Sequence, residues 1–138
     1  MKSLIPKIIG ALINFIAVFN AAYASKLALK LFSKPRDGQL NSYANSFLET
    51  ATTKTTLHYN NLPIQTYHWK GTKETVLLAH GWESNSGRWR HKIQKLQKED
   101  YNIIALDGPA HGGSGSDTFN AILYSEFINV VSERFKPT

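Results

Sequence analysis

The sequence contains no cysteine, which excludes a disulfide-stapled domain, a thiolate zinc site and a cysteine nucleophile. Acidic residues are missing from the first 36 positions, which hold six of the sixteen lysines and arginines. Residues 37–138 hold ten basic and ten acidic side chains, so the net charge of +6 comes entirely from the N-terminal segment. A basic face across the domain, as nucleic-acid binding requires, is therefore not indicated, and we expect no nucleic-acid partner.

Apolar residue types make up 42% and charged types 19% of the 138 residues, which is typical of one globular domain. An uncharged run, residues 8–25, lies between Lys7 and Lys26. A secretory signal peptide would use this run and a cleavage site at residues 22–24, but the basic residues that follow at once resist translocation. A membrane-spanning anchor would be short against the roughly 20 residues that a helix needs.

A third interpretation of this segment is a pair of helices that packs on the domain or lies on a bilayer surface. Lys26, Lys30 and Lys34 recur every four residues and would share one helix face, as in a basic interfacial helix. This interpretation favours a cytoplasmic protein that contacts a membrane surface through residues 1–34, while an anchored or exported protein is the alternative. Because proline and glycine end helices, we expect a hydrophobic, basic helical segment over 1–38. A polar connector over 39–53 would follow, with a short helix near 43–48.

The pattern changes to alternating strands and helices from residue 54 onwards. Residues 55–59 and 63–69 are β-rich and flank Asn60-Asn61, which favours a tight hairpin turn because asparagine tolerates positive φ. Residues 75–79 and 102–106 are apolar without alternation, as strands covered on both faces are. Helical spacing predicts helices over 88–98 and 119–135, the second capped by Asp117 or Thr118. The expected apolar face of this last helix comprises Phe119, Ile122, Leu123, Phe127, Val130 and Val131.

This order predicts an α/β domain over residues 54–138, with a mostly parallel sheet and right-handed crossovers. Ligands of such sheets bind beyond the carboxyl ends of the strands, which here lead into the loops 80–87 and 107–116. The second loop has the glycine spacing of a phosphate-binding loop at Gly108 and Gly113, but Ser114 stands where that motif needs a lysine. A nucleotide site is therefore not favoured, and we expect no cofactor and no metal.

Together the two loops resemble the N-terminal half of the α/β-hydrolase superfamily. The first strand runs into His80-Gly81-Trp82, similar to the family's H-G-x oxyanion motif. The second runs into Asp107-Gly108-Pro109-Ala110-His111-Gly112-Gly113-Ser114, similar to the motif D-x-P-G-H-G-x-S, with alanine at position 110 in place of the usual glycine. The resemblance covers residues 54–135. It implies a partial α/β-hydrolase sheet, made of a β-hairpin plus two parallel strands with helices, preceded by the N-terminal hydrophobic helices.

The resemblance also implies roles for single residues. Acyl transfer passes through a tetrahedral oxyanion that backbone N–H donors stabilise. Trp82 would provide one such N–H, and Gly81 would let the chain turn close to the substrate. The residues implied to organise the loops, and not to react, are His80, Asp107, His111 and Gly112. The implied parent is a serine esterase, lipase or peptidase that acts on a small-molecule acyl substrate.

The nucleophile motif of that family, G-x-S-x-G, is missing from the sequence. Residues 112–116 come closest, but Ser116 replaces the second glycine and the segment follows the wrong strand, so Ser114 is expected to be a turn serine. In the family the acid and the base come later still. We therefore expect either a truncated version of a longer hydrolase or an inactive short protein that binds a membrane or a partner. In the family's order the strand 76–79 has neighbours on both sides, so here it would present an apolar edge.

Overall fold

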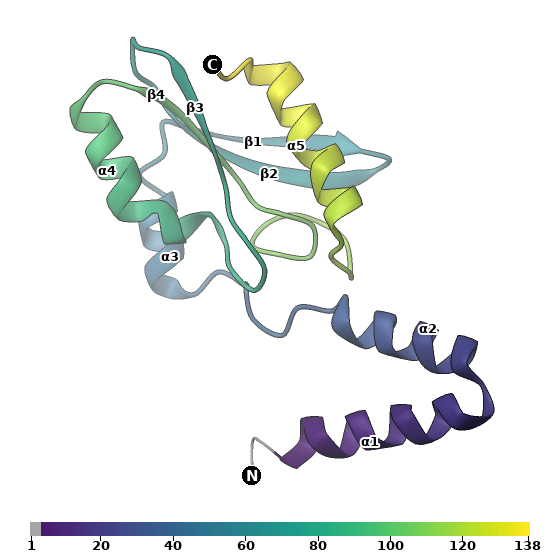
Figure 1. Cartoon of the computed structure of the whole chain (residues 1–138). Coiled ribbons are helices and arrows are strands. Elements are labelled where there is room, and N and C mark those ends of the chain that lie inside the picture. The colour runs from purple at the N-terminus through teal and green to yellow at the C-terminus, as the bar shows by residue number, and fades with distance from the viewer. Residues whose placement is uncertain (1–3) are drawn as a thin grey trace. The chain divides into compact units, whose positions relative to one another are not determined.

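The computed structural model describes residues 4–138 and divides into two compact units, Met1–Lys34 and Pro35–Thr138. The first unit consists of α1 (Leu4–Phe19) and α2 (Ala21–Phe32), two helices that run back along each other (Figure 1). Asn20 separates them and caps α2, since its side chain accepts a hydrogen bond from the Tyr23 N–H at 2.9 Å. Among residues 4–138, no helix combines the length and the apolar character that a bilayer crossing requires.

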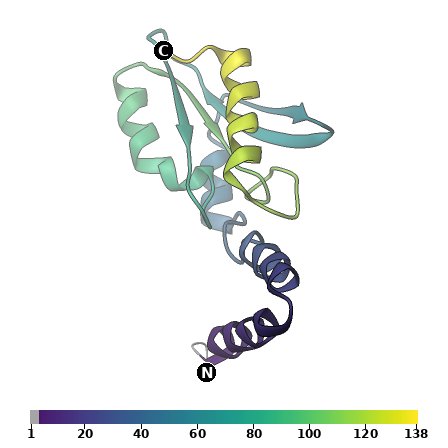
Figure 2. The same ribbon diagram turned by 45° about the vertical axis from the view of Figure 1, so that its right-hand side comes forward.

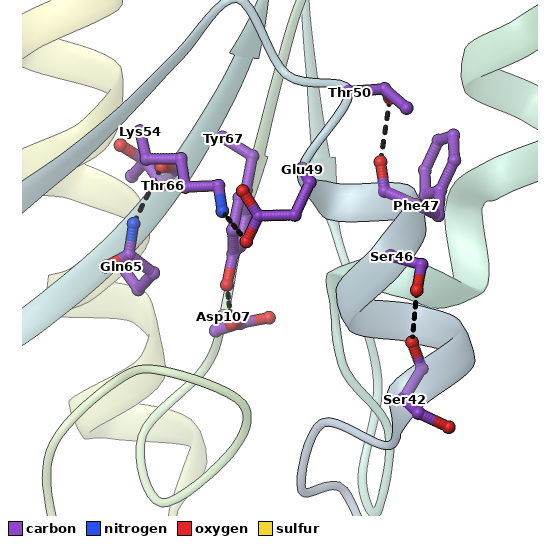
Figure 3. Close-up of polar contacts among 10 residues, drawn as sticks. All are labelled: Ser42, Ser46, Phe47, Glu49, Thr50, Lys54, Gln65, Thr66, Tyr67 and Asp107. Carbon is purple, nitrogen blue, oxygen red and sulfur yellow. Dashed lines mark hydrogen bonds and ion pairs between the residues drawn. The ribbon is translucent and has the colours of Figure 1, made fainter.

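The segment 39–53, predicted as a polar connector, contributes a helix to the core of the second unit. Its helix, α3 (Ser42–Leu48), is the predicted short helix and is capped by Asn41, which accepts a hydrogen bond from the Ala44 N–H. Phe47 and Leu48 are buried, and the Phe47 ring stacks on Trp69 with 5.6 Å between ring centroids. Figure 3 shows the hydroxyl groups of Ser46 and Thr50 bonded to carbonyl oxygens of α3. Three buried apolar residues out of seven, Ala44, Phe47 and Leu48, therefore pack this helix against the domain.

Four strands form one sheet in the order β1-β2-β4-β3. β1 (Thr53–Tyr59) and β2 (Leu62–Trp69) are the predicted antiparallel hairpin. Both turn residues, Asn60 and Asn61, have positive φ, 46° and 65°, as a two-residue hairpin turn requires. β3 (Thr75–Ala79) and β4 (Asn102–Leu106) are parallel. The expectation of a mostly parallel sheet is wrong, because the hairpin lies beside β4 and β2 pairs with β4 in the antiparallel sense.

Helices cover both faces of this sheet. α3 and α4 (Arg90–Lys98), which follows the 3₁₀ turn Ser86–Trp89, lie on one face, and α5 (Ala121–Phe135) lies on the other (Figures 1 and 2). β4 runs between the two layers and is the predicted strand buried on both faces. Its side chains alternate, with Ile103 and Ala105 in the α3–α4 layer and Ile104 and Leu106 in the α5 layer.

Three predicted details of these elements are wrong. β3 lies at the edge of the sheet, so only Leu78 among its five residues is buried, and the strand is not covered in the way that its apolar run indicated. α5 is capped by Asn120, whose side chain accepts a hydrogen bond from the Leu123 N–H at 2.8 Å, and not by Asp117 or Thr118. The sheet buries the α5 face centred on Tyr124, Phe127 and Val131, whereas Ile122, expected on that face, is 78% exposed.

Candidate functional site

The two loops singled out in the sequence meet at one edge of the sheet. β3 and β4 are parallel and in register, with Ala79 opposite Leu106. The residues that follow the two strands therefore lie at the same edge of the sheet. His80 and Asp107 are these next residues, and both are buried. The loops that follow are joined by hydrogen bonds between buried side chains and backbone groups, which hold one loop against the other.

Asp107 is the centre of this hydrogen-bond network. Its Oδ1 accepts a hydrogen bond from the Ser86 N–H at 2.8 Å, and its Oδ2 accepts one from the Gly113 N–H at 2.9 Å. The Tyr67 hydroxyl donates to Oδ2 at 3.1 Å, and Figure 3 shows this side chain pointing from β2 toward the carboxylate. A fully buried carboxylate is tolerated because its oxygen atoms are paired in this way.

Close packing around Asp107 explains one glycine of the second loop. Gly112 has a φ of +51°, and a β-carbon at this position would overlap the Asp107 carboxylate. Its N–H donates to the carbonyl of Gly38 at 2.9 Å. Burial, together with the neighbouring Asp107 carboxylate, raises the pKa of Tyr67, so this phenol stays protonated and remains a hydrogen-bond donor.

His80 connects the first loop to the second. Its Nε2 accepts a hydrogen bond from the Gly108 N–H at 2.9 Å, which leaves Nδ1 to carry the proton and donate to the Gly81 carbonyl at 2.7 Å. The side chain is 3% exposed. Burial lowers the pKa of His80, which keeps the ring neutral and suits the acceptor role of Nε2.

His111 makes the reciprocal connection from the second loop. Its Nε2 accepts a hydrogen bond from the Glu83 N–H at 3.0 Å, and its Nδ1 lies 2.8 Å from the Pro109 carbonyl, to which it donates. The side chain is fully buried. Each histidine thus uses both ring nitrogens on backbone groups, and neither ring nitrogen is left to take part in proton transfer in this arrangement.

Aromatic rings pack against both histidines. Trp82, which is 42% exposed, contacts His111 and Phe119 edge to face, with centroids 5.7 and 5.3 Å apart. Tyr124 of α5 donates a hydrogen bond from its hydroxyl to the His80 carbonyl at 2.9 Å. Burial raises the pKa of Tyr124, so its hydroxyl also remains a donor.

The backbone around Trp82 is the accessible part of this arrangement. Within residues 4–138 the Trp82 N–H has no hydrogen-bond acceptor. A β-carbon at Gly81 would meet no atom within 4 Å. The Trp82 N–H is therefore an unpaired donor next to open space. In the same loop the buried Ser86 hydroxyl is also without a hydrogen-bond partner in the described part of the chain.

Ser114, the serine of the segment that comes closest to the nucleophile motif, makes the hydrogen bonds of a turn serine. Its hydroxyl donates to the Asp107 carbonyl at 2.6 Å and accepts from the Gln65 N–H at 2.9 Å. Within the described part of the chain, no group of three or more histidine, aspartate or glutamate side chains is arranged to hold a metal ion. A groove of about 560 Å³ has Glu83 and Arg88 in its lining but neither Gly81 nor Trp82.

Sequence reasoning missed three members of this site: Tyr67, Ser86 and Tyr124. Tyr67 lies in a strand and Ser86 contributes only its N–H, so neither has a sequence signal that separates it from ordinary residues. Tyr124 had a weak signal, since Tyr124, Phe127 and Val131 recur at helical spacing.

Comparisons of the sequence and the structure with known proteins show which fold this is. No protein-family model matches the sequence. A monoacylglycerol lipase of Mycolicibacterium smegmatis is 36% identical over 53 residues, which are 38% of this chain and 19% of that protein. The chain thus spans about a fifth of the length of this curated relative.

Solved structures match over a larger part of the chain. A thioesterase domain from the curacin biosynthetic pathway matches with a TM-score of 0.55 and 19% identity, over 60% of this chain and 33% of that one. A membrane phospholipase A, described as a bacterial virulence factor, matches with a TM-score of 0.52 and 20% identity, over 96% of this chain and 40% of that one. Epoxide hydrolases match with TM-scores of 0.53 to 0.55. The sheet with its helices therefore has the fold of part of an α/β-hydrolase domain.

Proposed function

We propose that the two loops form the oxyanion side of the active site of a serine hydrolase that cleaves an ester or related acyl bond in a small molecule. The unpaired Trp82 N–H beside the open space over Gly81 is the observation that carries this proposal. In acyl transfer such an N–H stabilises the negative oxygen of the tetrahedral intermediate. The 36% identity to a monoacylglycerol lipase over 53 residues supports an acyl substrate.

Preorganisation is the contribution that the buried network would make to this reaction. An oxyanion donor is effective only if it is already in place when charge develops, because reorienting it would cost free energy. His80 bonds to both the Gly81 carbonyl and the Gly108 N–H, and Tyr124 holds the His80 carbonyl. In this proposal, His80, Asp107, His111 and Gly112 position the loops, and Trp82 is the residue whose backbone touches the reacting atoms.

The proposal requires a nucleophile, an acid and a base from residues outside this 138-residue sequence. In α/β-hydrolases the second oxyanion donor is the N–H that follows the nucleophile, so the pocket is complete only when that segment is present. A second candidate function is an inactive protein that binds a membrane or a partner. The edge position of β3 and the exposed apolar side chains of α1 favour it.

Fluorophosphonate labelling separates the two functions. We expect no labelling of the 138-residue chain, and labelling of a single serine in the protein translated from the longest reading frame that contains it. If neither protein is labelled, although circular dichroism shows that the longer one is folded, the hydrolase proposal is wrong. The function that binds a membrane or a partner is then favoured.

The role of Trp82 has its own test in the longer protein. Trp82→Pro removes the backbone N–H and is expected to lower kcat by about 10²–10³-fold, while Trp82→Phe keeps the N–H and a ring of similar packing. Equal kcat values for the two variants, both folded by circular dichroism, would rule out the Trp82 N–H as the donor.

A further inference from the structure

The hairpin of α1 and α2 leaves much of its apolar surface without a partner. Within the described part of the N-terminal unit only Ala24 is buried. Seven large apolar side chains of α1 are at least half exposed: Leu4, Ile5, Ile8, Leu12, Phe15, Val18 and Phe19. Exposed apolar surface of this extent on one element marks an interaction site, because each Å² left in water costs about 25 cal/mol.

The two helices use only a narrow face for each other. Ile9, Ile13 and Ile16 are the partly buried large side chains of α1, and Ala24, Ala28 and Leu31 are the less exposed residues of α2. Both sets recur at the spacing i, i+4, i+7, so each forms one helix face. The exposed apolar residues of α1 lie outside this contact, so the N-terminal unit by itself does not remove them from water.

The charges of this unit indicate what that occupant is. Lys26, Lys30 and Lys34 follow one another at four-residue intervals on and just after α2, and no acidic residue occurs among residues 1–36. A surface that is apolar and basic at once complements a bilayer with anionic headgroups, where each lysine near the surface contributes about 1 kcal/mol. A protein partner would need acidic and apolar surface in the same pattern.

We propose that residues 4–34 bind the surface of a bilayer that contains anionic phospholipids. The exposed apolar side chains of α1 enter the boundary between headgroups and acyl chains, and Lys26, Lys30 and Lys34 lie at the phosphates. This function does not depend on the proposed hydrolase activity, since it concerns the other compact unit and needs no residue of the loops around Trp82.

Vesicle co-sedimentation of the 138-residue chain tests the electrostatic part. We compare vesicles of phosphatidylcholine alone with vesicles in which a third of the lipid is phosphatidylglycerol. We expect tighter binding to the anionic vesicles, and we expect added salt to weaken it. The variant K26Q/K30Q/K34Q should lose about 100-fold in affinity for the anionic vesicles. The matched control K92Q/K95Q/K98Q removes three lysines from the α4 segment and should bind as the wild type does.

The apolar part is tested with a second pair of variants. F15S/V18S/F19S removes three exposed side chains of α1 and should reduce binding to both kinds of vesicle. Ile122→Ser removes a side chain of α5 that is equally exposed and should leave binding unchanged. Since all these side chains are exposed, the variants are expected to keep the wild-type circular dichroism spectrum.

Three results would overturn the proposal. Binding that is equal on neutral and anionic vesicles and insensitive to K26Q/K30Q/K34Q would remove the charge argument. Oligomers without lipid binding, dispersed by F15S/V18S/F19S, would make a second copy of the chain the occupant. Resistance to extraction by both high salt and alkaline carbonate would indicate insertion across the bilayer instead of surface binding.

Discussion

Ala110 is a single residue at which the backbone conformation and the side chain disagree. Its φ of +61° lies in the left-handed region, which costs an L-residue about 1–2 kcal/mol relative to glycine. Its N–H donates to the Gly115 carbonyl at 3.1 Å, so the turn of the second loop holds it there. This conformational strain falls at the position where the α/β-hydrolase motif D-x-P-G-H-G-x-S usually has glycine.

We expect Ala110→Gly to stabilise the protein by about 0.5–1 kcal/mol, because the relief of strain exceeds the entropy that glycine adds to the unfolded chain. Urea unfolding measures this change. The control Ala105→Gly, at a buried position of β4 without positive φ, should destabilise instead. A lower unfolding free energy for Ala110→Gly would show that the lost methyl contacts outweigh the strain.

His80 makes stability depend on pH through its own titration. Burial lowers its folded-state pKa below the ordinary value of 6.5, so the unfolded chain takes up a proton first as the pH falls. The stabilisation is therefore complete above about pH 6.5 and is lost as the pH decreases toward the lower folded-state pKa.

This effect is measured as the difference between wild type and His80→Gln in urea unfolding at about pH 7.5 and pH 5.5. Glutamine can still accept the Gly108 N–H but does not titrate. We expect the wild type to lose more stability on acidification than the variant, by at most about 1.4 kcal/mol per pH unit. Identical losses would mean that His80 is protonated equally in the folded and unfolded chains.

At the scale of an element, α5 begins after the cap Asn120, whereas the sequence pattern predicted a cap two or three residues earlier, at Asp117 or Thr118. Asn120 has an extended backbone, and its side chain accepts the Leu123 N–H, whereas the exposed Asp117 lies in the preceding loop. Phe119, expected inside the helix, instead packs between Trp82 and Tyr124 at the candidate site. The helix start thus determines which aromatic ring reaches the loops.

Asn120→Ala is expected to lower the unfolding free energy by about 1 kcal/mol, because it leaves an N–H of the first helical turn without an acceptor. Asp117→Ala should change it by less than about 0.5 kcal/mol. Thermal or urea unfolding of the two variants side by side decides between the caps. The reverse order of effects would restore the predicted cap.

At the scale of the whole molecule, two surfaces that proteins ordinarily cover are exposed. β3 is an edge strand of the described sheet, and apolar side chains of α1 face water. An unprotected edge strand can pair with a strand of another chain, and exposed apolar surface drives association.

We therefore expect the 138-residue chain to self-associate in the absence of lipid, with a mass that rises with concentration in size-exclusion chromatography with light scattering. F15S/V18S/F19S should reduce this association, and any association through β3 should persist in that variant. A monodisperse monomer with a sharp cooperative melt would contradict the expectation.

The elements and the loop positions of this protein follow from local sequence signals. Asn60-Asn61 supports positive φ by itself, and the apolar run 102–106 is long enough for a strand that needs cover on both faces. Because two parallel strands end at one edge, His80 and Asp107 could be placed near each other before any coordinates. These features depend on backbone preferences and on periodicity, which act over a few residues.

Tertiary structure alone decided which groups complete the site and which surfaces stay open. The bonds of Tyr67 to Asp107 and of Tyr124 to His80 join residues 40 and 44 positions apart, and no local pattern encodes such pairs. The burial of Tyr124 instead of Ile122, and the edge position of β3, depend on where neighbouring elements pack. The physical reason is that side-chain pairing and burial are properties of the assembled layers, whereas turns and strands are properties of short segments.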